Sequence, residues 1–172
     1  LGAFTLSSDD VVHRLLTLPS NIQHISDICG SHVLVKGNID RKRVAQIVFS
    51  DAKKLMKLEE LLHPQALAKI KKSFAEVEKL GHFEAFVVEV PLLYEAGWEP
   101  YFDQVLALKA DPKVCETRYG ESRSALEDFY RRRERQLAES EKLKRADIQI
   151  ENNGSLEELE QKITEAYHHL LK

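Results

Sequence analysis

Two features of this 172-residue chain have the residue types and positions that phosphate chemistry would need. Asp9 follows a short apolar stretch and precedes a helical pattern. Its carboxylate is therefore placed either to cap that helix or to accept a proton from a hydroxyl during phosphoryl transfer. Six arginines fall within residues 118–135, interrupted by acidic residues. They form either a solvated, salt-bridged helix pair or a lid whose arginines close over phosphates.

A third candidate lies at the end of an apolar run. Phe86 to Val90 is apolar except for Glu89, which predicts a strand buried on both faces and ended by Pro91. Ligands of open α/β sheets bind beyond the carboxyl ends of the strands, so residues 91–95 should line any site. Glu89 is either a strand-end glutamate with a basic partner or a carboxylate that faces a metal–phosphate site.

The elements that would position these residues begin with a strand over residues 3–6. A helix follows, with Val11, Val12, Leu15 and Leu16 on its apolar face. Residues 10–80 are predicted to be mostly helical. This segment is longer than the crossover of a simple βαβ unit, which predicts an inserted helical lobe over about residues 20–80. Further helices are expected over residues 21–29, after the cap Asp40, from Ser50-Asp51 to a break at His63-Pro64, and from Pro64 to about Leu80.

The second half of the chain supplies two more strands. Residues 104–109 predict a buried strand, and residues 147–150 a short edge strand. Ser155 and Glu158 have the spacing of a capping box, and the last helix follows them. Helices that alternate with at least three apolar strands indicate a single α/β domain of the doubly wound kind, with a parallel sheet flanked by helices.

Composition excludes several classes of protein. The formal net charge is −3, so a general nucleic-acid binder is not favoured. Cys29 and Cys115 fit neither a CxxC motif nor a disulfide framework, which favours a reducing cytoplasm. No apolar run reaches the length of a membrane span. The seven histidines show no HExxH motif, so we expect no zinc site, and no Walker A pattern GxxxxGK[ST] occurs in residues 1–172.

Five segments, taken in order along the chain, resemble one family. They are LGAFTLSSDDVVHRLL, GNIDRKRVAQIVFSDAKKLMKLEELLHP, VVEVPLLYEAG, ADPKVCETR and RQLAESEKLKRADIQIENNGSLEELE. In this order and with these gaps they are similar to dephospho-coenzyme A kinase, a P-loop kinase of the last step of coenzyme A synthesis. The resemblance covers nearly the whole chain. It implies ATP-dependent phosphorylation of the 3′-hydroxyl of dephospho-coenzyme A with Mg²⁺, and a helical lid over about residues 118–145.

The resemblance also implies roles for individual residues. Asp9 matches the family's proposed base. Arg118 matches a helix arginine that contacts nucleotide phosphates, and the resemblance implies a catalytic role for it, in which it would stabilise charge on the transferred phosphoryl group. The acceptor would be bound by residues spread over the chain, and the nucleotide by the lid and the C-terminal turn. The acceptor-side residues are His13, His63, Pro91, Leu92 and Glu95, and the nucleotide-side residues are Arg118, Arg123, Arg132, Asn153 and Gly154.

The chain also departs from the family pattern. Ser7 replaces the first aspartate of the family's D-A-D, and His13 stands where the family usually has arginine, which would weaken binding of the acceptor phosphate near neutral pH. The family's first strand, Walker A loop and first helix are expected before Leu1, and without them we expect no phosphoryl transfer. Two other readings stay open: another small P-loop kinase, such as a nucleoside monophosphate kinase, and a non-catalytic binding module derived from a kinase.

Overall fold

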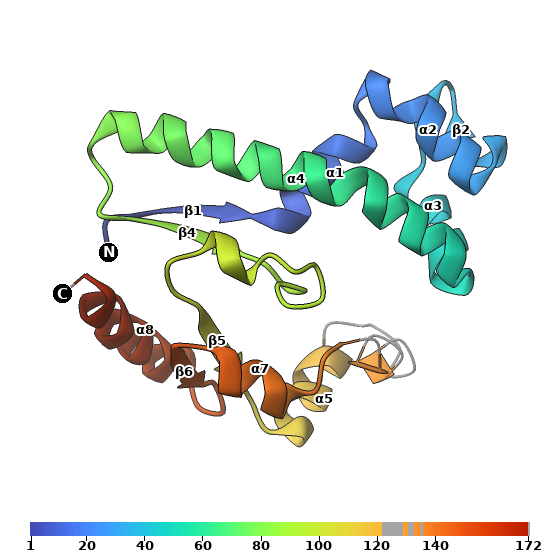
Figure 1. Cartoon of the computed structure of the whole chain (residues 1–172). Coiled ribbons are helices and arrows are strands. Elements are labelled where there is room, and N and C mark those ends of the chain that lie inside the picture. The colour runs from blue at the N-terminus through green and yellow to red at the C-terminus, as the bar shows by residue number, and fades with distance from the viewer. Residues whose placement is uncertain (122–128, 131–132, 135, 172) are drawn as a thin grey trace. The chain divides into compact units, whose positions relative to one another are not determined.

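The computed structural model describes residues 1–121, 129–130, 133–134 and 136–171 (Figure 1). These residues form two compact units, one made of Gly2–Pro91 and the other of Leu1 with Leu92–Lys172. The first unit contains β1 (Ala3–Ser7), α1 (Ser8–Leu16), α2 (Pro19–Cys29), the 3₁₀ turn η1 (Ser31–Val33), β2 (Leu34–Val35), β3 (Asn38–Ile39), α3 (Arg41–Ser50), α4 (Ala52–Leu80) and β4 (Ala85–Glu89). The second contains η2 (Glu99–Tyr101), β5 (Leu106–Lys109), α5 (Pro112–Glu121), α7 (Glu139–Arg145), β6 (Ile148–Glu151) and α8 (Leu156–Leu170).

Each unit is built on a pair of parallel strands. β1 pairs with β4 in parallel, from Ala3 opposite Ala85 to Ser7 opposite Glu89. β5 pairs with β6 in parallel, from Leu106 opposite Ile148 to Lys109 opposite Glu151. Parallel strands need helical crossovers, and helices α1 to α4 connect β1 to β4. The predicted α/β class, with parallel strands flanked by helices, is confirmed.

The expectation that the strands are buried on both faces is wrong for the described residues. Val87 of β4 is 44% exposed, and Leu108 of β5 is 55% exposed. In the described part of the chain, each parallel strand has one strand partner. Successive side chains of a strand point to opposite faces, so a helix packed on one face does not cover the other. Phe74 of α4 contacts one face of β4 edge-on through Phe86, at 5.6 Å between ring centroids, while the face that carries Val87 stays open.

A second expectation that proves wrong is the helix break at His63-Pro64. α4 is one helix of 29 residues with Pro64 inside it, as Figure 1 shows in green. Pro64 has no N–H to donate to the carbonyl of Glu60, which costs up to about 3 kcal/mol in a helix interior. Burial of an apolar stripe on both sides of the proline offsets this cost. The stripe consists of Leu58, Leu62, Ala66, Ile70 and Val77.

Helices α1, α2 and α4 are joined by a buried polar contact. The Asn21 side chain is 3% exposed. Its Nδ2 donates to the carbonyl of Leu15 at 3.0 Å and to Oε1 of Gln65 at 2.9 Å. Gln65 returns a hydrogen bond from Nε2 to Asn21 Oδ1 at 3.2 Å and donates to the carbonyl of Leu61. The last turn of α1 is therefore held to both α2 and α4.

Helix caps and turns follow the local sequence. Asp40 and Asp51 cap α3 and α4 by accepting backbone N–H bonds, and the predicted capping box of Ser155 and Glu158 is present at α8. Lys36 (φ 51°) and Gly37 (φ 79°) turn the β2–β3 hairpin, because a type I′ turn needs positive φ at both central residues. Along α8 the side chains of Ala166 and Tyr167 are buried, whereas Leu156 at its start is 68% exposed.

We predict that Pro64→Ala stabilises the protein. The substitution restores an N–H donor to the middle of α4, and the entropy gained by the unfolded chain offsets part of the benefit. The free energy of unfolding should rise by about 1–2 kcal/mol in urea denaturation. Lys57→Ala, an exposed position of the same helix, should change it by less than about 0.5 kcal/mol. A fall in stability of the Pro64 variant would show that the local backbone requires proline.

Candidate active site

Asp9 lies in the first turn of α1, directly beyond the carboxyl end of β1. Ser7 occupies the N-cap position with extended backbone angles (φ −97°, ψ 127°), so α1 begins at Ser8 and Asp9 is its second residue. Asp9 is therefore not the N-cap, and that reading is wrong. Its side chain is exposed, while Ser8 beside it is buried. The helix dipole favours a carboxylate in this turn, and the carboxylate stays accessible to a ligand.

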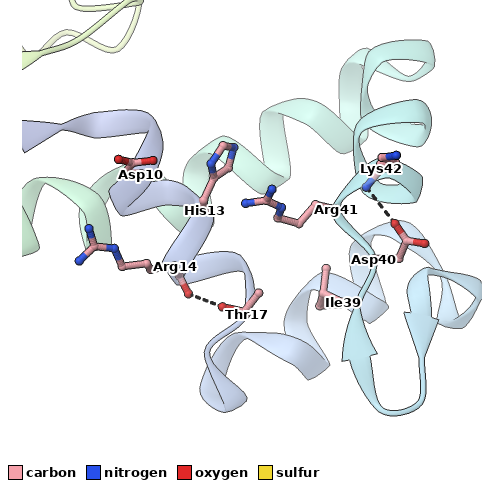
Figure 2. Close-up of a pocket in the computed structure, with 8 residues that line it drawn as sticks. All are labelled: Asp10, His13, Arg14, Thr17, Ile39, Asp40, Arg41 and Lys42. Carbon is pink, nitrogen blue, oxygen red and sulfur yellow. Dashed lines mark hydrogen bonds between the residues drawn. The ribbon is translucent and has the colours of Figure 1, made fainter.

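A cavity of about 730 Å³ opens in the same unit beside α1. Its walls come from α1 and Thr17 on one side and from β3 with the start of α3 on the other (Figure 2). Basic side chains predominate among the residues that line it, which are Asp10, His13, Arg14, Thr17, Ile39, Asp40, Arg41 and Lys42. The predicted acceptor residue His13 is thus brought together with basic residues of α3 that are far from it in the sequence.

The basic side chains of this cavity point in different directions. Arg41, the first residue of α3, extends toward His13 of α1, whereas Arg14 extends away from Arg41 (Figure 2). The position of Arg41 follows from its neighbour, because Asp40 Oδ1 accepts the N–H groups of Lys42 at 3.0 Å and Arg43 at 3.3 Å and so starts the helix. Asp40 Oδ2 also forms an ion pair with Arg43 Nε at 3.4 Å.

The predicted nucleotide-side residues meet in the second unit. Arg118 of α5 donates from one terminal nitrogen to the carbonyl of Asn152 at 2.7 Å and from the other to the carbonyl of Gly154 at 3.0 Å. Asn153 Oδ1 accepts the N–H of Asp111 at 2.7 Å, and its Nδ2 donates to Glu151. The guanidinium therefore holds the turn after β6. A hollow of about 330 Å³ lies on α5, lined by Lys113, Val114, Thr117, Arg118 and Glu121.

The predicted acceptor loop after β4 is tied to α7. Pro91 and Leu92 are exposed, Leu92 to 40%. Glu95 Oε1 accepts the N–H of Leu137 at 2.7 Å and forms an ion pair with Lys142 Nζ at 2.9 Å, with the two side chains 20% and 19% exposed. Burial alone would raise the pKa of Glu95, but the hydrogen bonds from Lys142 and Leu137 outweigh it and hold the pKa below its usual range.

Two further contacts fasten the same loop. Tyr94 donates its hydroxyl to the carbonyl of Lys142 at 3.2 Å, and the guanidinium of Arg145 lies 4.3 Å from the centre of the Tyr94 ring. Arg145 also pairs with Glu99. Burial, together with the nearby Glu99 carboxylate, raises the pKa of the Tyr94 phenol, and the cation of Arg145 opposes the rise. These side chains therefore hold the loop after β4 in place, while Leu92 at the start of the loop stays exposed.

The remaining predicted residues add little to the geometry of the candidate site. His63 is half-buried within α4 rather than at a helix end. Arg123 and Arg132 lie outside the described residues. Arg41 is not among the residues predicted from the sequence, although the aspartate cap that precedes it marks the start of its helix. The ion pair between Glu95 and Lys142 could not be predicted, because the 46 residues between them leave no local signal.

Comparisons with known proteins point to the same family that the five sequence segments resemble. Residues 2–158 match the family model for dephospho-CoA kinase. Curated dephospho-CoA kinases of Chlamydia abortus and Chlamydia felis are 36% and 38% identical to the chain, over 99% of it and 85% of their own lengths. A crystal structure of a Thermus thermophilus protein superposes with a TM-score of 0.81 at 29% identity, and the dephospho-CoA kinase of Campylobacter jejuni with 0.71 at 27%. Both cover 98% of this chain and 85% of the neighbour.

We predict that Glu95→Gln lowers stability in a pH-dependent way. A carboxylate whose pKa is depressed by folding stabilises the protein above its unfolded value, about 4.3, and this contribution is lost as the pH falls through the lower folded pKa. The variant should be less stable by about 1 kcal/mol at pH 6 and nearly equal at pH 3 in urea denaturation. Glu165→Gln, an exposed position on α8, is the control. An equal loss at both pH values would show that the carboxylate's charge is not involved.

Proposed function

Since the chain belongs to the dephospho-CoA kinase family, we propose that it transfers the terminal phosphoryl group of ATP to the 3′-hydroxyl of dephospho-CoA and so forms coenzyme A. The observation that carries this proposal is the family match over residues 2–158, which includes the whole of α1 and its exposed Asp9. The fold agrees with it, because Asp9 follows a parallel strand at its carboxyl end, where ligands of such sheets bind.

In the proposed reaction Asp9 acts on the acceptor. Its carboxylate accepts a hydrogen bond from the 3′-hydroxyl, orients it and takes its proton as the hydroxyl oxygen attacks the terminal phosphorus of ATP. A new O3′–P bond forms, the bond between that phosphorus and the bridging oxygen breaks, and ADP leaves with the electron pair. Positioning and charge stabilisation account for most of the rate enhancement in this type of reaction.

Mg²⁺ is the ion that we expect with ATP. It is a hard cation that keeps several waters and takes one or two carboxylates together with phosphate oxygens. Within the described ranges, no three His, Cys, Asp or Glu side chains gather to hold a metal. The exposed carboxylate of Glu89 nevertheless fits this ion, because it lies at the carboxyl end of the β1–β4 pair. When bound, the ion would neutralise phosphate charge.

The other predicted residues take supporting parts in this proposal. Arg118 holds the turn that contains Asn153 and Gly154, which we propose lies at the adenine of ATP. Two lid arginines, Arg123 and Arg132, would meet the phosphates. Residues 20–80 would form the acceptor lobe and residues 118–145 the lid. His13, His63, Pro91, Leu92 and Glu95 remain the proposed acceptor-side residues.

We also propose where the protein works and on what kind of substrate. No helix among the residues that the structure describes is long and apolar enough to cross a membrane. Both cysteines are free thiols. Reduced cysteines are usual where glutathione keeps thiols reduced, so we propose that the protein works in the cytoplasm on a small-molecule substrate.

Asp9→Asn in the full-length protein should lower kcat by two or more orders of magnitude and leave the KM for ATP within about twofold, because the amide cannot accept the proton. A coupled assay of ADP release with dephospho-CoA measures both constants. Asp10→Asn is the matched control, since it removes the neighbouring carboxylate of the same helical turn, and its kcat should stay within about twofold. Unchanged turnover in the Asp9 variant would remove this residue from the mechanism.

The choice of acceptor tests the function itself. The full-length protein should phosphorylate dephospho-CoA and should not phosphorylate AMP, CMP or UMP under the same conditions. Transfer to a nucleoside monophosphate with none to dephospho-CoA would instead support the alternative of a nucleoside monophosphate kinase.

A further inference from the structure

The hydrogen bonds of Arg118 indicate what this residue does in the proposed reaction. Its two terminal nitrogens donate to the carbonyl of Asn152 at 2.7 Å and to the carbonyl of Gly154 at 3.0 Å. We propose that Arg118 is a positioning residue, which shapes the turn of residues 152–154 for ATP and does not touch the transferred phosphoryl group, an inference that rests on the proposed function. The sequence resemblance, in contrast, implies a catalytic contact for Arg118.

The arrangement of the two carbonyls suits a guanidinium. They belong to alternate residues of one turn, on either side of Asn153. A guanidinium is a planar fork whose donors have fixed directions, so a single arginine side chain fixes both carbonyls relative to each other. A lysine carries one ammonium group on a flexible stem and cannot fix them in this way. The shape of the turn therefore depends on the fork of Arg118 and not only on its charge.

A second side chain joins the same turn to the same helix. Asn153 Oδ1 accepts the N–H of Asp111 at 2.7 Å, and Asp111 directly precedes α5. Arg118 reaches the turn from about two helical turns further along α5. The turn is thus joined to α5 at two points. Residues that hold one segment together are coupled in energy, so the loss of one makes the other less effective.

The other side of the turn is fixed to α8. Ser155 Oγ accepts the N–H of Glu158 at 3.2 Å, and Glu158 Oε2 accepts the N–H of Ser155 at 3.3 Å, so α8 starts directly after the turn. A Cβ at Gly154 would collide with this Oε2, which explains the glycine at this position. Lys162 of α8 donates to the carbonyl of Glu151 at 2.9 Å. We therefore expect the loss of Arg118 to loosen the turn without unfolding its surroundings.

The structure of ATP separates a role at the turn from a role in the reaction. The ribose and two phosphate groups lie between the adenine and the transferred phosphoryl group. A guanidinium that is bonded to a turn at the adenine therefore contributes to the binding of ATP in the ground state and the transition state alike. Loss of such uniform binding raises KM and leaves kcat unchanged, whereas loss of a contact made only in the transition state lowers kcat. The two roles predict different changes in the kinetic constants.

Steady-state kinetics of the full-length protein with dephospho-CoA test the proposal. Arg118→Met should raise the KM for ATP by about tenfold or more and lower kcat less than about threefold. Arg118→Lys should raise this KM nearly as much, because lysine keeps the charge but not the fork. Lys113→Met is the matched control, since it removes an exposed cation of the same helix, and its KM for ATP should stay within about twofold. Circular dichroism of each variant establishes that it is folded.

A double-mutant cycle tests whether Arg118 acts through the turn. Asn153→Ala removes the other tie to α5 and should itself raise the KM for ATP several-fold. In the Asn153→Ala background, Arg118→Met should raise this KM by a smaller factor than in the unaltered protein, because both residues hold the same turn. Titration calorimetry with a non-hydrolysable ATP analogue should show the same pattern in Kd.

The outcomes separate the role of Arg118 from the proposed function. A kcat that falls about a hundredfold or more in Arg118→Met, with an unchanged KM for ATP, would show contact with the transferred group. That result, or independent losses in the cycle, would overturn the positioning role and leave the function standing. A normal KM in Arg118→Lys, or an equal rise in Lys113→Met, would overturn it in favour of an effect of charge alone. An unaltered full-length protein that does not phosphorylate dephospho-CoA would overturn the proposed function and the positioning role together.

Discussion

The reciprocal pair of amides formed by Asn21 and Gln65 positions the helix on which the candidate active site is built. Asn21 is almost fully buried and satisfies both the carbonyl of Leu15 and the amide of Gln65, so the end of α1 is fixed to α2 and α4. Removing either amide would leave buried polar groups without partners, at a cost of about 1–3 kcal/mol each. The orientation of α1, and with it the places of Asp9 and His13, depends on this contact.

The charged residues divide into those that maintain the fold and those that remain available to ligands. Asp40 and Asp51 start helices, Glu95 ties its loop to Lys142, and Arg145 pairs with Glu99. At Glu95 the hydrogen bonds from Lys142 and Leu137 hold the pKa below its usual range, so this carboxylate is a poor proton acceptor. Asp9, in contrast, is exposed beyond a strand end. In our proposal this carboxylate takes the proton of the acceptor hydroxyl, and this role connects the fold with the reaction.

The two units use their parallel strands in the same way, since each places its candidate residues just beyond the carboxyl ends. Asp9 and Glu89 lie at or next to the ends of β1 and β4, and the turn held by Arg118 follows β6 directly. Backbone groups at strand ends leave the ladder there, so side chains from separate segments can converge without disturbing the pairing. The likeness to the solved dephospho-CoA kinase of Campylobacter jejuni, at 27% identity, agrees with this arrangement.

The sequence by itself determined the features that depend on near neighbours: the caps at Asp40 and Ser155, the turn after β6, the α/β class and, through five ordered segments, the family. Only the tertiary structure decided the rest. Pro64 stays within one helix because the buried stripe on both sides of it outweighs a missing hydrogen bond. Val87 is exposed although its residue type favours burial, because what packs on a face of the strand decides whether a side chain there is buried. The approach of Arg41 to His13 joins segments that lie far apart along the chain, and only folding brings such segments together.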